Sequence, residues 1–96
     1  MTIRDDRRRF LGPFAQSMRL SLGLTQNDIS KGTGFSIQTI SKFENGHSNP
    51  FSYSSREIIG YLCALGMHEG WDVDKLFDNF CFNMELMERQ DWVYDS

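Results

Sequence analysis

The sequence predicts an all-α fold of five helices, of which the last is extended. Three observations lead to this prediction. Serine, threonine and aspartate residues stand where they would cap the N-terminus of a helix, apolar residues recur at spacings of three and four, and glycines separate the successive segments. At 96 residues the chain has the length of one small domain.

The first two helices follow from their start signals. Proline at the first helical position loses no hydrogen bond, so a helix is expected from about Pro13 to residue 21. Its inward-facing residues are expected to be Ala15, Met18 and Leu22. The second helix is expected over 25–31, where Thr25 caps the N-terminus and Asp28 completes a capping box. Leu24 and Ile29 flank this cap as a hydrophobic staple.

A third helix is expected over 36–45, after a tight turn at 32–34 that contains two glycines. Ser36 would cap its N-terminus. Its C-terminus falls at Asn45-Gly46, because glycine takes the left-handed conformation that ends many helices. Two helices that cross at such a turn form a helix-turn-helix unit.

The apolar side chains decide which face of the third helix lies inside. Ile40 and Phe43 are three residues apart and share one face, whereas Gln38 and Lys42 point the other way. An amide pairs with adenine through two hydrogen bonds, and a lysine reaches guanine acceptors or a phosphate. This outer face is therefore a candidate for reading base pairs. The alternative is a polar face that is merely solvated.

The sequence of the C-terminal half predicts two further helices. The fourth is expected from a cap at Ser54 or Ser55 to Gly66. Its apolar residues are Ile58, Ile59, Leu62, Cys63 and Leu65. The fifth and longest is expected to begin at Asp72 or Asp74 and to pack one stripe on the preceding helices. The residues of this stripe are Val73, Leu76, Phe77, Phe80, Met84 and Met87.

The segment 11–50, LGPFAQSMRLSLGLTQNDISKGTGFSIQTISKFENGHSNP, resembles the lambda-repressor-like, or xenobiotic-response-element, family of helix-turn-helix DNA-binding domains. The most specific strings are GLTQ at 23–26 and ISKFENG at 40–46. The resemblance implies a five-helix fold in which residues 11–70 form the helix-turn-helix domain that binds double-stranded DNA. Residues 71–96 would then form an extended C-terminal helix and tail.

The resemblance also implies roles for individual residues. Those expected to approach base edges are Ile37, Gln38 and Lys42. Those expected to contact the DNA backbone are Gln26, Ser36, Thr39, Ser41 and Asn45. Arg19 and Glu44 are implied to form an internal ion pair between the first helix and the end of the third. Ile37 suits a thymine methyl group better than a hydrogen bond. Two departures, Ser30 for alanine and Thr33 for leucine, would loosen the packing between the second and third helices.

Residues 1–10 are expected to form a basic arm ahead of the first helix. Its cationic run consists of Arg7, Arg8 and Arg9. Such an arm would contact DNA phosphates or enter a minor groove, as the arms of some DNA-binding domains do. The alternative is a solvated tail whose charge Asp5 and Asp6 partly offset.

The last helix and tail carry more apolar surface than one small core needs, which is typical of an interface. We therefore expect a two-fold homodimer through residues 71–96, which would set two recognition helices about one DNA turn, ~34 Å, apart. The residues expected at this interface are Phe80, Phe82, Met84, Leu86, Met87, Trp92 and Tyr94. The alternative is that the tail folds back over its own core.

The net charge of −3 argues against a nucleic-acid partner, because DNA is a dense polyanion. The distribution of charge weakens this argument. Residues 1–50 carry seven Lys and Arg against four Asp and Glu, whereas residues 51–96 carry three against nine. The half with the helix-turn-helix unit is thus basic, and salt limits the reach of distant carboxylates to about 8 Å.

Several classes of site are excluded by pattern. Cys63 and Cys81 lie in apolar stretches without CxxC spacing, so we expect small buried thiols and no disulfide or zinc site. His47 and His68 have no ligand-spaced partners, so no metal or cofactor is expected. No glycine-rich phosphate loop or catalytic triad pattern is present, which argues against an enzyme. Without an apolar run of eighteen or a signal peptide, we expect a cytoplasmic protein and no membrane association.

These observations favour a transcription regulator, expected to be a repressor that binds an inverted-repeat operator as a homodimer. The alternative is a protein-interaction module. In that case the acidic, aromatic-rich C-terminal half would inhibit another protein, and the helix-turn-helix unit would serve autoregulation. Some small phage-type proteins of the family resembled here pair both tasks.

Overall fold

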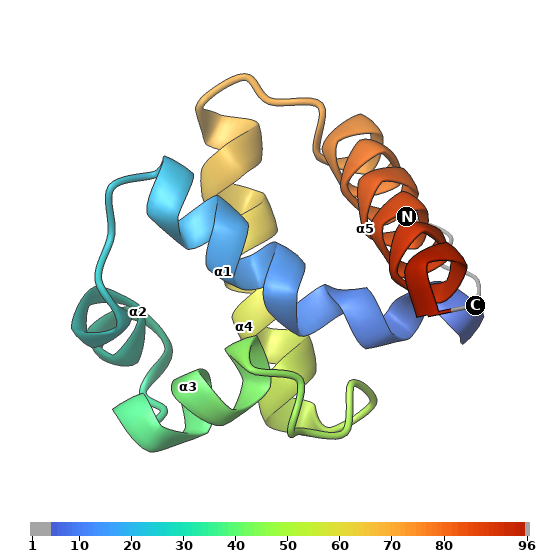
Figure 1. Ribbon diagram of the computed structural model, residues 1–96. Helices are drawn as coiled ribbons and strands as arrows, with labels where there is room; N and C mark the ends of the chain where they lie inside the picture. Colours follow the sequence, from blue (N-terminus) through green and yellow to red (C-terminus); the bar gives the residue numbers. More distant parts are fainter. Residues whose placement is uncertain (1–4, 96) are drawn as a thin grey trace.

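The computed structural model describes residues 5–95, with the side chains of residues 6–89. This part of the chain folds into a short 3-10 helix and five α-helices (Figure 1). They are η1 (Asp5–Phe10), α1 (Leu11–Ser21), α2 (Gln26–Thr33), α3 (Ile37–Glu44), α4 (Tyr53–His68) and α5 (Val73–Asp95). The prediction of an all-α fold with an extended last helix is confirmed.

Helix α1 lies at the centre of the molecule and packs against α3 and α4. Helix α2 packs against α3 and α4, whereas α5 contacts α4 and η1. As a result, α2 and α5 lie on opposite sides of α1 (Figure 1). Among the described helices, none combines the length and the apolar character that crossing a membrane requires.

The second and third helices begin where the sequence predicts. Thr25 Oγ1 accepts a hydrogen bond from Asp28 N–H at 3.1 Å, and Asp28 Oδ2 accepts one from Thr25 N–H at 2.8 Å, which completes the capping box. Ser36 Oγ accepts from Thr39 N–H at the start of α3. Helix α2 runs two residues further than expected, through Thr33, because Gly34 at φ +83° ends it in the left-handed conformation.

Two helix starts differ from the prediction. Helix α1 begins at Leu11 and continues directly from η1, so Pro13 is not its first residue. Ser52 caps α4 in place of Ser54 or Ser55. Ser55 is buried, and its hydroxyl donates to Asn49 O at 2.9 Å. That hydrogen bond ties α4 to the preceding loop.

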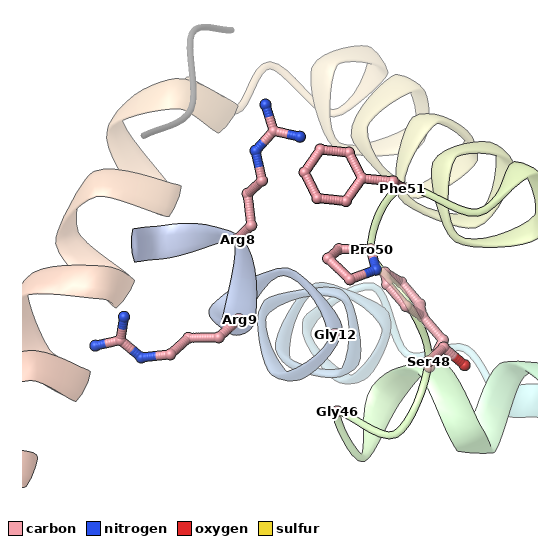
Figure 2. A pocket seen from close by; sticks show the side chains of 8 residues that line it. Arg8, Arg9, Gly12, Gly46, Ser48, Pro50 and Phe51 are labelled. Carbon is pink, nitrogen blue, oxygen red and sulfur yellow. The ribbon is translucent and has the colours of Figure 1, made fainter. Parts of the chain in front are cut away.

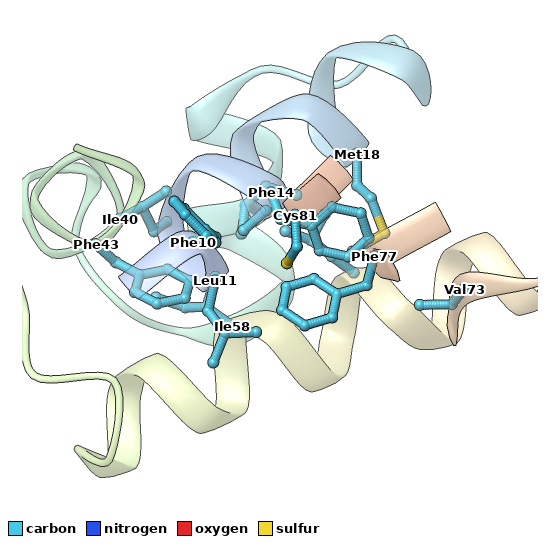
Figure 3. Close-up of a cluster of buried hydrophobic side chains, with 13 residues drawn as sticks. Phe10, Leu11, Phe14, Met18, Ile40, Phe43, Ile58, Val73, Phe77 and Cys81 are labelled. Atoms are coloured by element: carbon cyan, nitrogen blue, oxygen red, sulfur yellow. The ribbon is translucent and has the colours of Figure 1, made fainter. Parts of the chain in front are cut away.

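The core is one cluster of apolar side chains between α1 and its neighbours (Figure 3). Its buried members are Phe10, Leu11, Phe14, Ala15, Met18, Ile29, Ile40, Phe43, Ile58, Leu62, Val73, Phe77 and Cys81. Phe14 joins α5 to α1 through ring contacts with Phe77, 5.1 Å between centroids, and with Phe80, 5.5 Å between centroids.

The inner face of α5 is rotated from the stripe expected from the sequence. Cys81 is fully buried, whereas Leu76 and Met87 are 40% and 58% exposed. The buried residues Val73, Phe77 and Cys81 follow one another at a spacing of four. This rotation also brings the acidic side of α5 against η1, where ion pairs form.

Helix α1 approaches the end of α3 backbone to backbone. A Cβ atom placed on Gly12 would lie 1.9 Å from Phe43 O, so only glycine fits at this crossing. The close approach fixes where α3 ends relative to the central helix.

Candidate nucleic-acid interface

Helix α3 presents one face to solvent and buries the other. Ile40 and Phe43 are 0% and 2% exposed and hold the helix against the core. On the other face, Gln38 and Lys42 are exposed, and Ile37 is 45% exposed although it is apolar. The structure thus brings together on one accessible surface the three residues expected to approach base edges.

Four residues expected to contact a DNA backbone border this face. Ser36 and Asn45 are exposed at its two ends, and Thr39 and Ser41 are half-buried along it. Ser36 Oγ and Thr39 Oγ1 lie 2.9 Å apart, and Asn45 Nδ2 donates to Ser41 Oγ at 3.3 Å. The polar side chains at the border of this face are therefore hydrogen-bonded to one another in two pairs.

Side-chain hydroxyls tie α2 to the residues before α3. Ser30 Oγ donates to Phe35 O at 2.6 Å, and Thr33 Oγ1 donates to Ile29 O at 2.7 Å. Thr33 Oγ1 also accepts from Phe35 N–H at 3.3 Å. We expected Ser30 and Thr33 to loosen this junction. Their hydroxyls form hydrogen bonds at this junction, which alanine and leucine could not form.

A buried ion pair joins α1 to the end of α3. Arg19 Nε donates to Glu44 Oε2 at 2.7 Å and Arg19 Nη2 to Glu44 Oε1 at 3.0 Å, while Arg19 Nη1 donates to Leu24 O at 2.9 Å. The Glu44 side chain is fully buried. Gln26 Nε2 also donates to Glu44 Oε1, at 3.1 Å. The network therefore fixes the N-terminus of α2, where Gln26 is half-buried, to the C-terminal end of α3.

The expected N-terminal arm is, over residues 5–10, the helix η1, and two of its arginines bind α5. Arg7 donates to Asp78 at 2.6 Å and to Glu85 at 3.0 Å. These carboxylates raise the pKa of Arg7, chiefly through their hydrogen bonds. Arg9 donates to Glu88 at 3.0 Å. The free arm is thus corrected to a helix, because the acidic side of α5 lies beside η1 and pairs with its cations.

Arg8 also contacts the loop that follows α3. Its guanidinium is 4.1 Å from the centroid of the Phe51 ring, in the loop between α3 and α4. Figure 2 shows the Arg8 side chain beside Phe51 and the Arg9 side chain pointing away from it, toward α5. Helix η1 is therefore in contact with the loop after α3 as well as with α5.

The residues expected at a dimer interface divide into three groups. Phe80 and Met84 are half-buried and pack against the core of their own chain. Phe82 and Met87 are 56% and 58% exposed, and Leu86 is 38% exposed. The last two residues, Trp92 and Tyr94, have side chains outside the described part of the chain.

The carboxylates that hold η1 to α5 were missed at the sequence level. Asp78 and Glu85 are seven residues apart and so lie on one side of a helix, but that spacing also fits a solvated face. Only the tertiary contact between α5 and η1 identifies Arg7 as their partner.

Comparison with known proteins agrees with this geometry. Residues 16–50 match the model of the helix-turn-helix family. The matched segment runs from the middle of α1 through α2 and α3 to the loop before α4. Searches of curated proteins and of solved structures gave no match.

Proposed function

We propose that this protein represses transcription by binding an inverted-repeat operator as a homodimer. The match of residues 16–50 to the helix-turn-helix family supports a DNA-binding role. The observation that carries the proposal is the exposed face of α3. Ile37, Gln38 and Lys42 form an accessible surface on a helix whose other face is anchored in the core. A helix presented in this way fits the major groove, which is about 12 Å wide.

Each residue of this face has a matching chemistry on DNA. The Gln38 amide both donates and accepts, as adenine requires, and the Lys42 ammonium donates to guanine N7 and O6 or to a phosphate. Ile37 offers an apolar contact for a thymine methyl group. Ser36, at the N-terminus of α3, has a hydroxyl suited to the adjacent DNA backbone.

The decisive experiment measures binding by fluorescence anisotropy, with DNA from upstream of the protein's own gene and with a scrambled duplex, over a salt series. We expect Gln38→Ala and Lys42→Ala to reduce the preference for the operator by about 5-fold to 150-fold each, since one good base contact contributes about 1–3 kcal/mol. The matched control is Lys31→Ala, an exposed lysine on α2. Operator preference that survives both α3 substitutions would exclude this face as the reading surface.

The homodimer is proposed through the outer side of α5. Phe82 and Leu86 lie four residues apart on the side of the helix turned away from Phe77 and Cys81. A two-fold axis near these residues places an apolar patch against its own copy. It would set two α3 helices about one turn of DNA apart, ~34 Å, as an inverted repeat requires.

Analytical ultracentrifugation with DNA titration tests the dimer. The double variant Phe82→Ser with Leu86→Ser should sediment as a monomer and bind the operator more weakly, with unchanged binding to a single half-site. The control Met67→Ser alters an exposed apolar residue of α4, and its oligomeric state should equal that of the unaltered protein. If the double variant still forms a dimer, the dimer interface does not lie on Phe82 and Leu86.

The exposed apolar side of α5 also favours the alternative, a surface for another protein. The two proposals differ in the mass of the isolated chain. A strict monomer at all concentrations, which loses an inhibitory activity with Phe82→Ser but keeps it with Lys42→Ala, would support a protein partner for α5.

A further inference from the structure

An open pocket of about 520 Å³ lies where the start of α1, the second half of α4 and the start of α5 meet. Among the described residues, none of α2 or α3 lines it, so the pocket is separate from the exposed face of α3. Its walls are mainly apolar with a few polar groups, as in most small-molecule sites of this size. The apolar side chains at the walls are Leu11, Ile59, Cys63, Met67, Trp71 and Val73.

Gly60, in the middle of α4, lines this pocket, and no contact within the chain requires glycine there. All eight glycines lie in the described part of the chain, and seven of them either have a positive φ or would place a Cβ atom 3.0 Å or less from a neighbouring atom. A Cβ atom on Gly60 would meet no atom within 4 Å. Glycine weakens a helix interior relative to alanine, and it is typical where a ligand approaches the backbone closely. Gly60 therefore indicates room for an occupant from outside the chain.

Trp71 supplies an aromatic wall that is fixed in position. Its backbone N–H donates to Gly66 O at 3.0 Å, and its indole ring lies so close to Gly66 that a Cβ atom there would be 3.0 Å from the ring. The Trp71 side chain is half-buried, so part of it remains accessible from the pocket. Among aromatic side chains, tryptophan attracts cations most strongly, through the face of its ring. This wall therefore suits a ligand that is both apolar and positively charged.

The charged groups that line the pocket are two carboxylates, those of Asp72 and Asp74, and both residues are exposed. Asp72 Oδ1 accepts from Lys75 N–H at 3.1 Å at the start of α5, whereas Asp74 forms no ion pair with a described residue. Burial and, after it, the charge of Asp74 raise the pKa of the Cys63 thiol, so the negative charge of Asp74 acts on a group at the pocket wall. The electrostatic field in the pocket therefore favours a cation.

We propose that this pocket binds a small lipophilic cation, such as an aromatic or alkyl quaternary ammonium or phosphonium ion. The apolar groups of the ligand pack on Trp71, Met67 and the open backbone at Gly60, and its positive charge lies beside Asp74. An anion of the same shape is repelled by the two carboxylates. The site goes beyond the proposed DNA-binding function and is tested without DNA.

Isothermal titration calorimetry with two probes of the same shape and opposite charge tests the ligand class. In potassium-free buffer, tetraphenylphosphonium should bind saturably, and tetraphenylborate should bind at least about 10-fold more weakly, because attraction by the carboxylates is replaced by repulsion. Asp74→Asn should weaken binding of the phosphonium about 2-fold to 5-fold, as expected for an exposed charge pair, and should not weaken binding of the borate. Asp72 stays unaltered in this test because it caps α5.

A substitution that fills the pocket tests its location. Gly60→Leu should weaken binding of tetraphenylphosphonium at least about 10-fold, because the leucine side chain occupies the space of the ligand. Since a Cβ atom at this position meets no atom within 4 Å and leucine favours a helix more than glycine does, urea unfolding should show a stable variant. The matched control is Ala64→Leu, at an exposed position of α4 that does not line the pocket, and its affinity should be unchanged.

Nuclear magnetic resonance of isotope-labelled methionine methyl groups gives a second measurement on the unaltered protein. Tetraphenylphosphonium should shift the methyl resonance of Met67, because a phenyl ring lies next to it, and should leave that of Met87 unchanged. Met67 and Met87 are 65% and 58% exposed, so exposure alone does not distinguish them. Absence of saturable binding, equal affinities for the two probes, full binding by Gly60→Leu or equal shifts of both methyl groups would each overturn the assignment.

Discussion

Removing the arginine of the buried ion pair should be among the most destabilising single changes in this protein. In Arg19→Met the apolar stem of the side chain is roughly retained, but the Glu44 carboxylate loses both guanidinium hydrogen bonds, of 2.7 and 3.0 Å. Only the Gln26 amide, at 3.1 Å, remains to solvate it within the described contacts. Because the Glu44 side chain is 0% exposed, water does not replace the lost donors.

The magnitude follows from this burial. Breaking a buried ion pair by removing one partner costs about 3–5 kcal/mol, since a charge is left uncompensated. A domain of this length has a free energy of unfolding of about 5–14 kcal/mol, at roughly 0.05–0.15 kcal/mol per residue. Arg19→Met should therefore remove a large part of the stability and lower Tm by about 12 °C or more.

Urea unfolding followed by circular dichroism measures this cost, and a double-mutant cycle assigns it. In Arg19→Met combined with Glu44→Leu, no charge is left unpaired, so the double variant should be more stable than Arg19→Met alone. The Gln26 amide then loses its carboxylate acceptor as well, but it is half-buried and reaches water. A cost below about 1 kcal/mol for Arg19→Met, or a double variant no more stable than the single one, would refute the reasoning.

Four further predictions concern the helix crossing, the cap of α2 and Cys63. Gly12→Ala should cost at least about 1–3 kcal/mol in urea unfolding, because its Cβ would lie 1.9 Å from Phe43 O and force α1 and α3 apart; an unchanged midpoint would contradict this. Thr25→Ala should cost about 1 kcal/mol, because the N-cap oxygen of α2 is lost; Ser in its place should restore it. The backbone and side-chain hydrogen bonds from Thr25 lower the pKa of Asp28 below its usual 3.8. The ionised Asp28 carboxylate therefore stabilises the fold above pH 3.8, and this effect is lost as the pH falls through the lowered folded-state pKa. The difference in urea midpoint between the unaltered protein and Asp28→Asn should accordingly vanish in acid. Burial raises the pKa of the Cys63 thiol, so mass spectrometry should find its alkylation by iodoacetamide at pH 7.5 slower than that of free cysteine, and equal rates would count against the burial.

The helix-turn-helix portion was predictable because its signals are local. Thr25 and Ser36 form their capping bonds with groups three residues away, and Gly34 needs only its own freedom at φ +83° to end α2. The exposed and buried faces of α3 follow from the spacing of Ile40 and Phe43. Interactions between residues three or four positions apart depend mainly on the local sequence. They can therefore be predicted without knowing the tertiary structure.

The surroundings of this unit were decided by contacts between distant residues. Arg7 binds Asp78, 71 positions further along the chain. This pairing holds η1 against α5, where the sequence led us to expect a free arm. Which apolar residues of α5 lie inside depended on how that helix meets η1 and α1, so Cys81 is buried and Leu76 is exposed. Residue types and spacing determined which segments are helical and which face of α3 meets solvent. The tertiary structure alone decided which charges neutralise each other, because partners for long, flexible arginine side chains are selected by proximity in space and by the burial that strengthens each pair.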